Sequence, residues 1–282
     1  MVAPASITIG GDLTVDRLGF GALHIAGGGS SSFGPPADKR AALALLRRAV
    51  EAGVQLIDTA DSYGPAVSET LIAEALHPYP KGLVIATKGG LTRPSTGRWD
   101  ADGRPAHLRE ACEASLKRLK LERIDLYQLH TVDPRVPLED SVGALAELKR
   151  QGKIRHIGVS NFDTRQLARA RKVTEIVSVQ NLYNLGDRSS DRVIDVCERD
   201  GLAFLPWYPL HGRSAVDASP RLRAVAQRHK ATTAQIVLAW LLRRSPAMLP
   251  IPGTSQVAHF EENWAAREIA LSDEDYAAFA RS

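Results

Sequence analysis

Residues 54–64 read VQLIDTADSYG, a short apolar run that ends at Asp58 and continues into a polar loop carrying Tyr63. Two further apolar runs end in the same way, at Lys88 and at His130. Runs that are short, continuous and apolar rather than alternating are typical of parallel strands covered on both faces. If these runs are strands of one barrel, their polar ends meet at one rim together with Tyr63.

The same pattern repeats along the chain. The first strand candidate spans residues 17–22, and further candidates end near Ser160, Gln180, Trp207 and Pro252, which makes eight. Alternation of strands with helices predicts parallel connections, and eight units predict closure into a (β/α)8 TIM barrel. The helical patterns cover residues 39–52, 69–76, 107–119, 138–151, 164–171, 191–199, 221–228, 233–243, 259–266 and 273–280.

The remaining segments complete the predicted barrel. Residues 8–15 predict a short N-terminal β-hairpin at the barrel floor, with Gly10-Gly11 as its turn. Residues 23–37, 89–106 and 208–219 are expected as long loops that form the walls and lid of the site, although the second could be surface padding. A doubly wound open sheet is the alternative, but residues 19–21 lack the third glycine of a nucleotide-binding fingerprint. No domain boundary is visible, so we expect residues 1–282 to form a single domain.

Composition narrows the classes of function. With 44% apolar and 24% charged residues, the 282-residue chain can build a large core. The net charge of +4 is scattered, and no basic stripe is interleaved with aromatic residues, which disfavours nucleic-acid binding. Cys112 and Cys197 lie in separate helical patterns, which fits a reducing compartment and gives no metal or redox pair. Without a secretory signal or an apolar run of membrane length, we expect a cytoplasmic protein, either a monomer or a small homo-oligomer.

The four polar side chains suit proton donation to a carbonyl oxygen. A free phenol has a pKa of about 10 and donates poorly at neutral pH, but a nearby ammonium lowers that pKa. We expect Lys88 to tune Tyr63 in this way, and Asp58 to hold Lys88 as an ammonium. His130 would orient the substrate oxygen toward the phenol. Each residue alone has a commoner structural explanation, so the hypothesis depends on their joint placement.

Several segments resemble, in order, the signatures of the aldo-keto reductase family. Residues 53–64 with Ser68-Glu69 resemble its first signature, and residues 116–130 its second. Residues 158–162 and 179–181 resemble its nicotinamide-binding segments, and residues 251–255 with Glu262-Asn263 resemble its phosphate-binding end.

This resemblance implies an enzyme that reduces aldehydes or ketones to alcohols with hydride from NADPH, with NADH possible as an alternative. It implies a catalytic tetrad of Asp58, Tyr63, Lys88 and His130, and cofactor binding without a Rossmann domain. The implied contacts to the nicotinamide carboxamide are Ser160, Asn161 and Gln180, with Trp207 under the ring. The other implied cofactor-binding residues are Tyr208, Leu210, Gly253, Thr254, Ser255, His259, Glu262 and Asn263.

Two departures from the family pattern bear on specificity. Gly253 and His259 stand where many members place lysine and arginine to grip the 2′-phosphate of NADPH. The chain also ends soon after Leu271-Ser272, without the long C-terminal loop of mammalian members, which predicts a more open site. Residues 33–36 and 251–255 with His259 resemble a bacterial subgroup that includes pyridoxal reductases.

Two other functions fit the same residues. Potassium-channel β subunits share this fold and tetrad, so a cofactor-binding regulatory subunit with slow turnover is one alternative. A Schiff-base lyase that uses Lys88 as its nucleophile is the other. Asp58 disfavours the lyase, because a salt bridge keeps the amine protonated.

Overall fold

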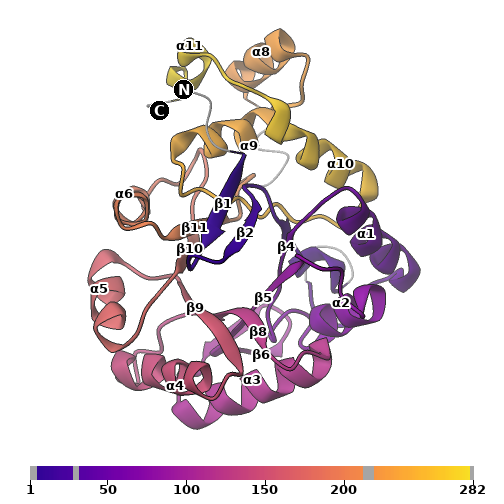
Figure 1. The fold of residues 1–282 in the computed structure, drawn as a ribbon. Helices are drawn as coiled ribbons and strands as arrows, with labels where there is room; N and C mark the ends of the chain where they lie inside the picture. Colours follow the sequence, from indigo (N-terminus) through magenta and orange to yellow (C-terminus); the bar gives the residue numbers. More distant parts are fainter. Residues whose placement is uncertain (1–4, 28–31, 212–218, 280–282) are drawn as a thin grey trace.

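The computed structural model describes residues 5–27, 32–211 and 219–279, and its centre is a parallel sheet (Figure 1). The strands are β3 (Phe20–Gly21), β4 (Leu56–Asp58), β5 (Val84–Gly89), β8 (Ile124–Leu129), β9 (Ile154–Ser160), β10 (Ser178–Leu182) and β11 (Ala203–Trp207). They form one sheet in the order β11-β10-β9-β8-β5-β4-β3, and every neighbouring pair is parallel. The predicted strand ends therefore lie at one edge of the sheet.

The segment 247–253 closes the barrel, although the prediction of a regular eighth strand was wrong. It bridges β11 through Phe204 and Met248, and it bridges β3 through Gly21 and Gly253. The Gly19 N–H donates to Pro250 O at 2.9 Å. Prolines at 250 and 252 have no N–H to donate, so a continuous ladder cannot form here.

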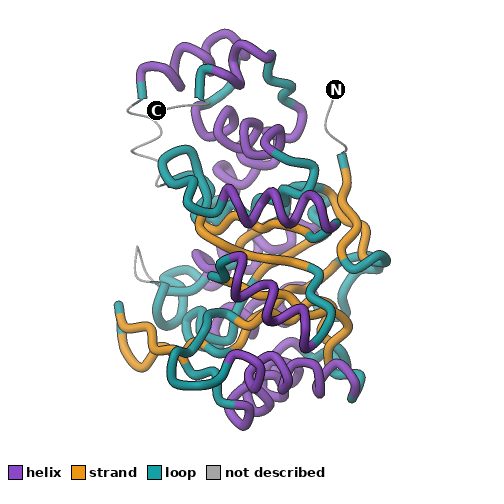
Figure 2. The backbone as a smooth tube through the Cα atoms, turned by 90° about the vertical axis from the view of Figure 1, so that its left-hand side faces the viewer, coloured by secondary structure: helices purple, strands orange, loops and turns teal. Residues whose placement is uncertain are grey.

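A hairpin of β1 (Ser6–Ile9) and β2 (Leu13–Asp16) fills one end of the barrel, as predicted. Its side chains pack with Leu56, Val84 and Leu126 from the barrel interior. The turn needs glycine: Gly10 has φ +60°, and a Cβ there would lie 2.3 Å from the His156 ring. In Figure 2 this hairpin lies at the right edge of the strands, where the chain begins.

Helices surround the sheet (Figures 1 and 2). In α1 the buried residues recur at helical spacing, and Asp38 caps the first turn by accepting from the Ala41 N–H at 2.9 Å. No helix in the described ranges is long and apolar enough to cross a bilayer. The helices are α1 (Lys39–Glu51), α2 (Val67–Leu76), α3 (Pro105–Leu119), α4 (Leu138–Arg150), α5 (Thr164–Val173), α6 (Asp191–Asp200), α8 (Pro220–His229), α9 (Thr233–Arg244), α10 (Val257–Ala265) and α11 (Asp273–Ala277), with the 3₁₀ turns η1 (Leu23–Ile25) and η3 (Ala266–Glu268).

The segment 89–106 is more ordered than the sequence predicted. Instead of a plain loop it forms a hairpin of β6 (Leu91–Ser95) and β7 (Arg98–Ala101), which turns at Gly97 with φ +77°. Most of its side chains are half-buried or exposed. The sequence therefore lacked the apolar run that marks the central strands.

Candidate active site

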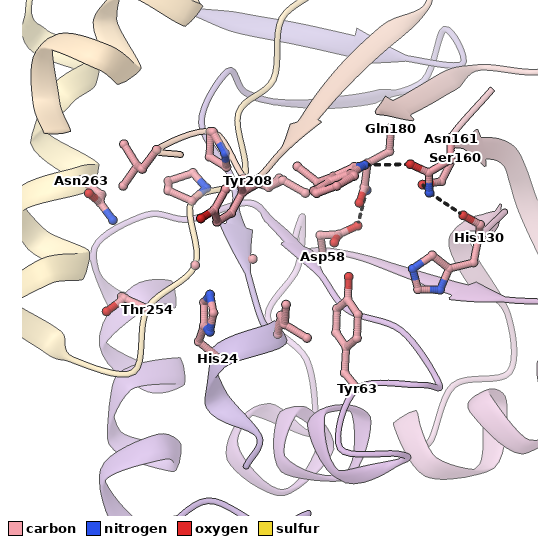
Figure 3. A pocket seen from close by; sticks show the side chains of 18 of the residues that line it. His24, Asp58, Tyr63, His130, Ser160, Asn161, Gln180, Tyr208, Thr254 and Asn263 are labelled. Atoms are coloured by element: carbon pink, nitrogen blue, oxygen red, sulfur yellow. Dashed lines mark hydrogen bonds between the residues drawn. The ribbon is translucent and has the colours of Figure 1, made fainter. Parts of the chain in front are cut away.

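A cavity of about 680 Å³ opens at the carboxyl ends of the strands. In Figure 3, Tyr63, Asp58 and His130 lie toward one end of it, Thr254 and Asn263 lie toward the other, and His24 lies between. The predicted site residues that line it are Asp58, Tyr63, His130, Ser160, Asn161, Gln180, Trp207, Tyr208, Leu210, Gly253, Thr254, His259 and Asn263.

Lys88 lies beneath the cavity wall and joins two of the lining residues. It is fully buried at the end of β5, where its Nζ donates to Asp58 Oδ2 at 2.6 Å and to Tyr63 Oη at 3.1 Å. A third bond runs to Thr59 O at 2.9 Å. The ammonium is thereby fixed between a carboxylate and the phenol, as the sequence predicted.

The charges of this cluster oppose the cost of burial. Burial alone would lower the pKa of Lys88, but Asp58 and Tyr63 raise it above its usual value, so the amine stays an ammonium. For Tyr63, burial raises the pKa above 10, and the Lys88 ammonium acts in the opposite direction. Lys88 thus has the predicted effect, but the expectation of a net lowered phenol pKa was wrong because removal from water outweighs it.

Asp61, in the same loop as Tyr63, is a half-buried residue whose carboxyl group acts on the phenol. Burial raises the pKa of Asp61 to about 8, with the Glu69 carboxylate adding to the effect. Its Oδ1 is buried and has no hydrogen-bond partner in the described part of the chain. The Asp61 carboxyl group therefore keeps its proton to a higher pH than an exposed aspartate does.

His130 follows β8 and faces Tyr63. The two rings are 6.0 Å apart between centroids and meet edge to face. Burial and the Lys88 ammonium hold the pKa of His130 well below its usual range, so the ring is neutral. A neutral imidazole carries one N–H, which can donate to a substrate oxygen at the phenol.

Polar side chains from β9, β10 and β11 fix the wall beside this cluster. The Trp207 indole N–H donates to Asn161 Oδ1 at 2.9 Å, and Asn161 Nδ2 donates to His130 O at 3.1 Å (Figure 3). Gln180 Nε2 donates to Asp58 Oδ1 at 2.8 Å. Asn161 has φ +60°, a left-handed conformation that asparagine adopts more readily than most residues.

The far end of the cavity is built where the chain enters α10. Thr254 Oγ1 accepts from the Gln256 N–H at 3.1 Å, while His259 and Asn263 line the cavity from the helix. Two predicted cofactor-binding residues are not part of the lining. Ser255 is exposed, and Glu262 accepts a bond from Thr232 Oγ1 at 2.6 Å on the side of α9.

The sequence model of the Aldo/keto reductase family matches residues 17–282. The chain belongs to the aldo/keto reductase family. Pyridoxine 4-dehydrogenase of Escherichia coli K12 is 45% identical to it over 270 residues, which cover 94% of this chain and 93% of that protein.

Solved structures agree in fold. A thermostable aldo-keto reductase in complex with the inhibitor epalrestat matches with a TM-score of 0.85 and 34% identity, covering 97% of this chain and 98% of the other. Aldo-keto reductase from Klebsiella pneumoniae in complex with NADPH matches with a TM-score of 0.83 and 27% identity, covering 99% and 94%. The predicted (β/α)8 barrel and the family resemblance are confirmed.

In this aldo/keto reductase, the far end of the cavity has groups that fit a nicotinamide dinucleotide. Asn263 Oδ1 is buried and lacks a hydrogen-bond partner within the described ranges, so it can accept from a bound ligand. Thr254 adds a hydroxyl beside the start of α10, whose first N–H groups favour anions. No lysine or arginine occurs among the described residues that line the cavity. The lining does include His24 and His259, and burial lowers the pKa of His24.

Gln128, Trp99 and His24 are among the residues of the reductase site that sequence reasoning missed. Gln128 is fully buried on β8 and donates from Nε2 to Asp58 Oδ1 at 3.1 Å. It could have been found, because it lies on β8 two positions before His130, and residues two positions apart along an extended chain point to the same side. Trp99 and His24 also line the cavity, but both come from segments predicted to be loops, where sequence alone gives no direction to a side chain.

Proposed function

We propose that this protein reduces aldehyde or ketone carbonyls to alcohols with NADPH, and with NADH as an alternative cofactor. The observation that carries this proposal is the buried Lys88 ammonium, 3.1 Å from the Tyr63 hydroxyl at the wall of a cavity large enough for a cofactor and a small substrate. A held cation beside a phenol makes proton donation to a reduced oxygen easier.

The proposed roles follow from the geometry. Tyr63 Oη gives its proton to the substrate oxygen, and the Lys88 ammonium stabilises the phenolate that remains. Asp58 keeps Lys88 charged and in place. The neutral His130 donates its N–H to the same oxygen and so orients the carbonyl.

A nicotinamide cofactor, when bound, supplies the hydride. Ser160, Asn161 and Gln180 would hold its carboxamide, and Trp207 would offer a flat apolar surface to the ring. Leu210, Gly253, Thr254, His259 and Asn263 would hold the remainder toward α10. Without lysine or arginine in the described lining, selectivity for the 2′-phosphate depends on histidine and backbone groups.

The substrate class we propose is flat aromatic aldehydes, with pyridoxal as the first to test. Trp99 and His130 meet edge to face, with 6.4 Å between ring centroids, and both line the same cavity as Tyr63. Such a wall favours planar aromatic compounds. The Escherichia coli relative named pyridoxine 4-dehydrogenase supports the choice.

The alternatives find less support. A Schiff-base lyase needs an accessible neutral amine, whereas Lys88 is fully buried and makes three hydrogen bonds. A regulatory subunit would turn over its substrate slowly, so the rate of turnover distinguishes it from a reductase.

We further propose that the protein is cytoplasmic, which accords with the buried, unpaired thiols of Cys112 and Cys197. For its assembly we propose a monomer or a small homo-oligomer.

A panel of carbonyl compounds assayed with NADPH and with NADH tests the proposal. Fast multiple turnover is expected, and Tyr63→Phe should lower kcat roughly 10²-fold or more while cofactor affinity stays within about twofold. Cofactor affinity is measured by quenching of tryptophan fluorescence. Turnover by Tyr63→Phe at the wild-type rate would remove Tyr63 as the proton donor.

A further inference from the structure

Gln128 is a buried residue on β8 that lies beside a glycine on the neighbouring strand β9. It lies opposite Lys88 in the pairing of β5 with β8, and opposite Gly158 in the pairing of β8 with β9. A Cβ at Gly158 would lie 2.9 Å from Gln128 Cγ, so a side chain there would crowd the glutamine. The fully buried Gln128 amide instead reaches across to Asp58.

Three donors together fix the Asp58 carboxylate. Lys88 holds Oδ2, while Gln128 and Gln180 both donate to Oδ1, at 3.1 and 2.8 Å. Gln180 lines the cavity, but Gln128 does not. Gln128 Oε1 also accepts from Gln180 Nε2 at 3.4 Å, so one buried amide contacts both Asp58 and a proposed cofactor-binding residue.

We propose that Gln128 is a positioning residue for proton donation. It stabilises the Asp58 carboxylate from the side away from Lys88, and so holds the ammonium at the Tyr63 hydroxyl. The inference rests on the proposed function, since it assigns Gln128 a task in the same reaction.

The expected consequence of losing Gln128 follows from the charges that face the phenol. These are the Lys88 ammonium and the Asp58 carboxylate, while Asp61, whose pKa is raised, and the neutral His130 are titratable neighbours without a full charge near neutral pH. A donor on Asp58 Oδ1 withdraws part of the negative charge that opposes Lys88. Without that donor, Asp58 disfavours the phenolate more strongly, so the Tyr63 pKa rises and proton transfer slows.

The variant Gln128→Met removes both amide atoms and keeps the side-chain length. Leu126→Met is the matched control, because Leu126 is fully buried on the same strand and face but is apolar. We expect Gln128→Met to lower kcat roughly tenfold, the scale of one hydrogen bond to a charged group, with cofactor affinity within about threefold. The basic limb of its pH profile should move to higher pH, and Leu126→Met should move neither quantity.

Gln128→Glu is a conservative variant whose activity should depend on pH in a way that differs from wild type. While its new carboxyl group is protonated, the O–H can donate to Asp58 as the amide did. As pH rises and that group ionises, two carboxylates face each other in a buried site, which is unfavourable. Activity should therefore approach wild type at low pH and fall with rising pH over a range where the wild type is steady.

A measurement independent of turnover completes the test. The ultraviolet absorbance of phenolate is followed against pH for wild type and Gln128→Met, each minus its Tyr63→Phe counterpart, which isolates one phenol. Gln128→Met should raise that titration midpoint. An unmoved midpoint overturns the role proposed for Gln128, and so does an equal rate loss in Leu126→Met. A wild type whose phenol titrates as expected but which reduces no carbonyl overturns the proposed function instead.

Discussion

Replacing Lys88 by methionine should weaken folding as well as catalysis. The Lys88 Nζ is fully buried and makes three hydrogen bonds, to Asp58 Oδ2, Thr59 O and Tyr63 Oη. Removing one partner of a buried ion pair leaves an uncompensated charge, which typically costs about 3–5 kcal/mol. Gln128 and Gln180 still donate to Asp58 Oδ1, so we expect a loss near the lower end, about 3 kcal/mol.

Thermal and urea unfolding, followed by circular dichroism, measure this loss. For a chain of this size each kcal/mol lowers the melting temperature by about 2–4 °C, so Lys88→Met should melt roughly 10 °C below wild type. The double variant Asp58→Asn/Lys88→Met removes the stranded carboxylate as well. It should therefore regain part of the lost stability, about 1–2 kcal/mol, because a neutral amide is less costly to bury than a charge.

The comparison of the two variants is what tests the reasoning. If the stranded charge causes the loss, the double variant must be more stable than Lys88→Met. A double variant that is equally or less stable would show that the lysine stabilises the barrel by packing its chain. A loss below about 1 kcal/mol in Lys88→Met would show that the pair is solvated in solution and not buried.

Three further expectations concern other parts of the site. Burial raises the pKa of Asp61 to about 8, so the folded protein keeps a proton that the unfolded chain releases near pH 4, and the free energy of unfolding should fall as pH rises across this interval. Urea titrations should show a flatter pH dependence of stability in Asp61→Asn than in wild type. Parallel curves for the two proteins would contradict the raised pKa. His259→Arg adds a permanent positive charge to the described lining, which has no lysine or arginine. It should raise the preference for NADPH over NADH roughly tenfold, measured as the ratio of the two dissociation constants. An unchanged ratio would mean that the 2′-phosphate binds elsewhere. Trp99→Ala should raise KM for aromatic aldehydes roughly tenfold and affect short aliphatic aldehydes much less, and an equal effect on both would mean that Trp99 only supports the β6–β7 hairpin.

The central strands could be predicted because each is a buried, continuous apolar run that stops at a polar residue. The ends at Asp58, Lys88 and His130 coincide with the observed edge of the sheet, and their side chains meet there. The segment at Pro252 met the same criteria, yet proline cannot donate to a ladder. A run of apolar residues thus predicts burial more reliably than it predicts hydrogen bonding.

The walls of the site could not be predicted in the same way. Trp99 is carried by a hairpin whose exposed, polar faces give no periodic apolar signal, and its ring rests under Arg93, whose Cζ lies 4.0 Å from the ring centroid. Such a contact depends on two side chains meeting across a turn. Residue type and spacing in one sequence do not specify it, which is why the chemistry of the site was more predictable than its substrate.

The buried pair at the centre of the site is better explained by chemistry than by stability. Apolar residues of similar volume often replace a buried ion pair without loss of stability, so folding alone gives little reason to bury Lys88 and Asp58. Here each charge has further partners: Lys88 contacts Tyr63, and Asp58 contacts two amides, one of which lines the cavity. A cation that only stabilised the barrel would not need to lie within hydrogen-bond distance of a phenol at the cavity wall. The cost of burying the pair is consistent with preorganisation, because donors that are already in position need not reorganise when charge develops on a substrate oxygen.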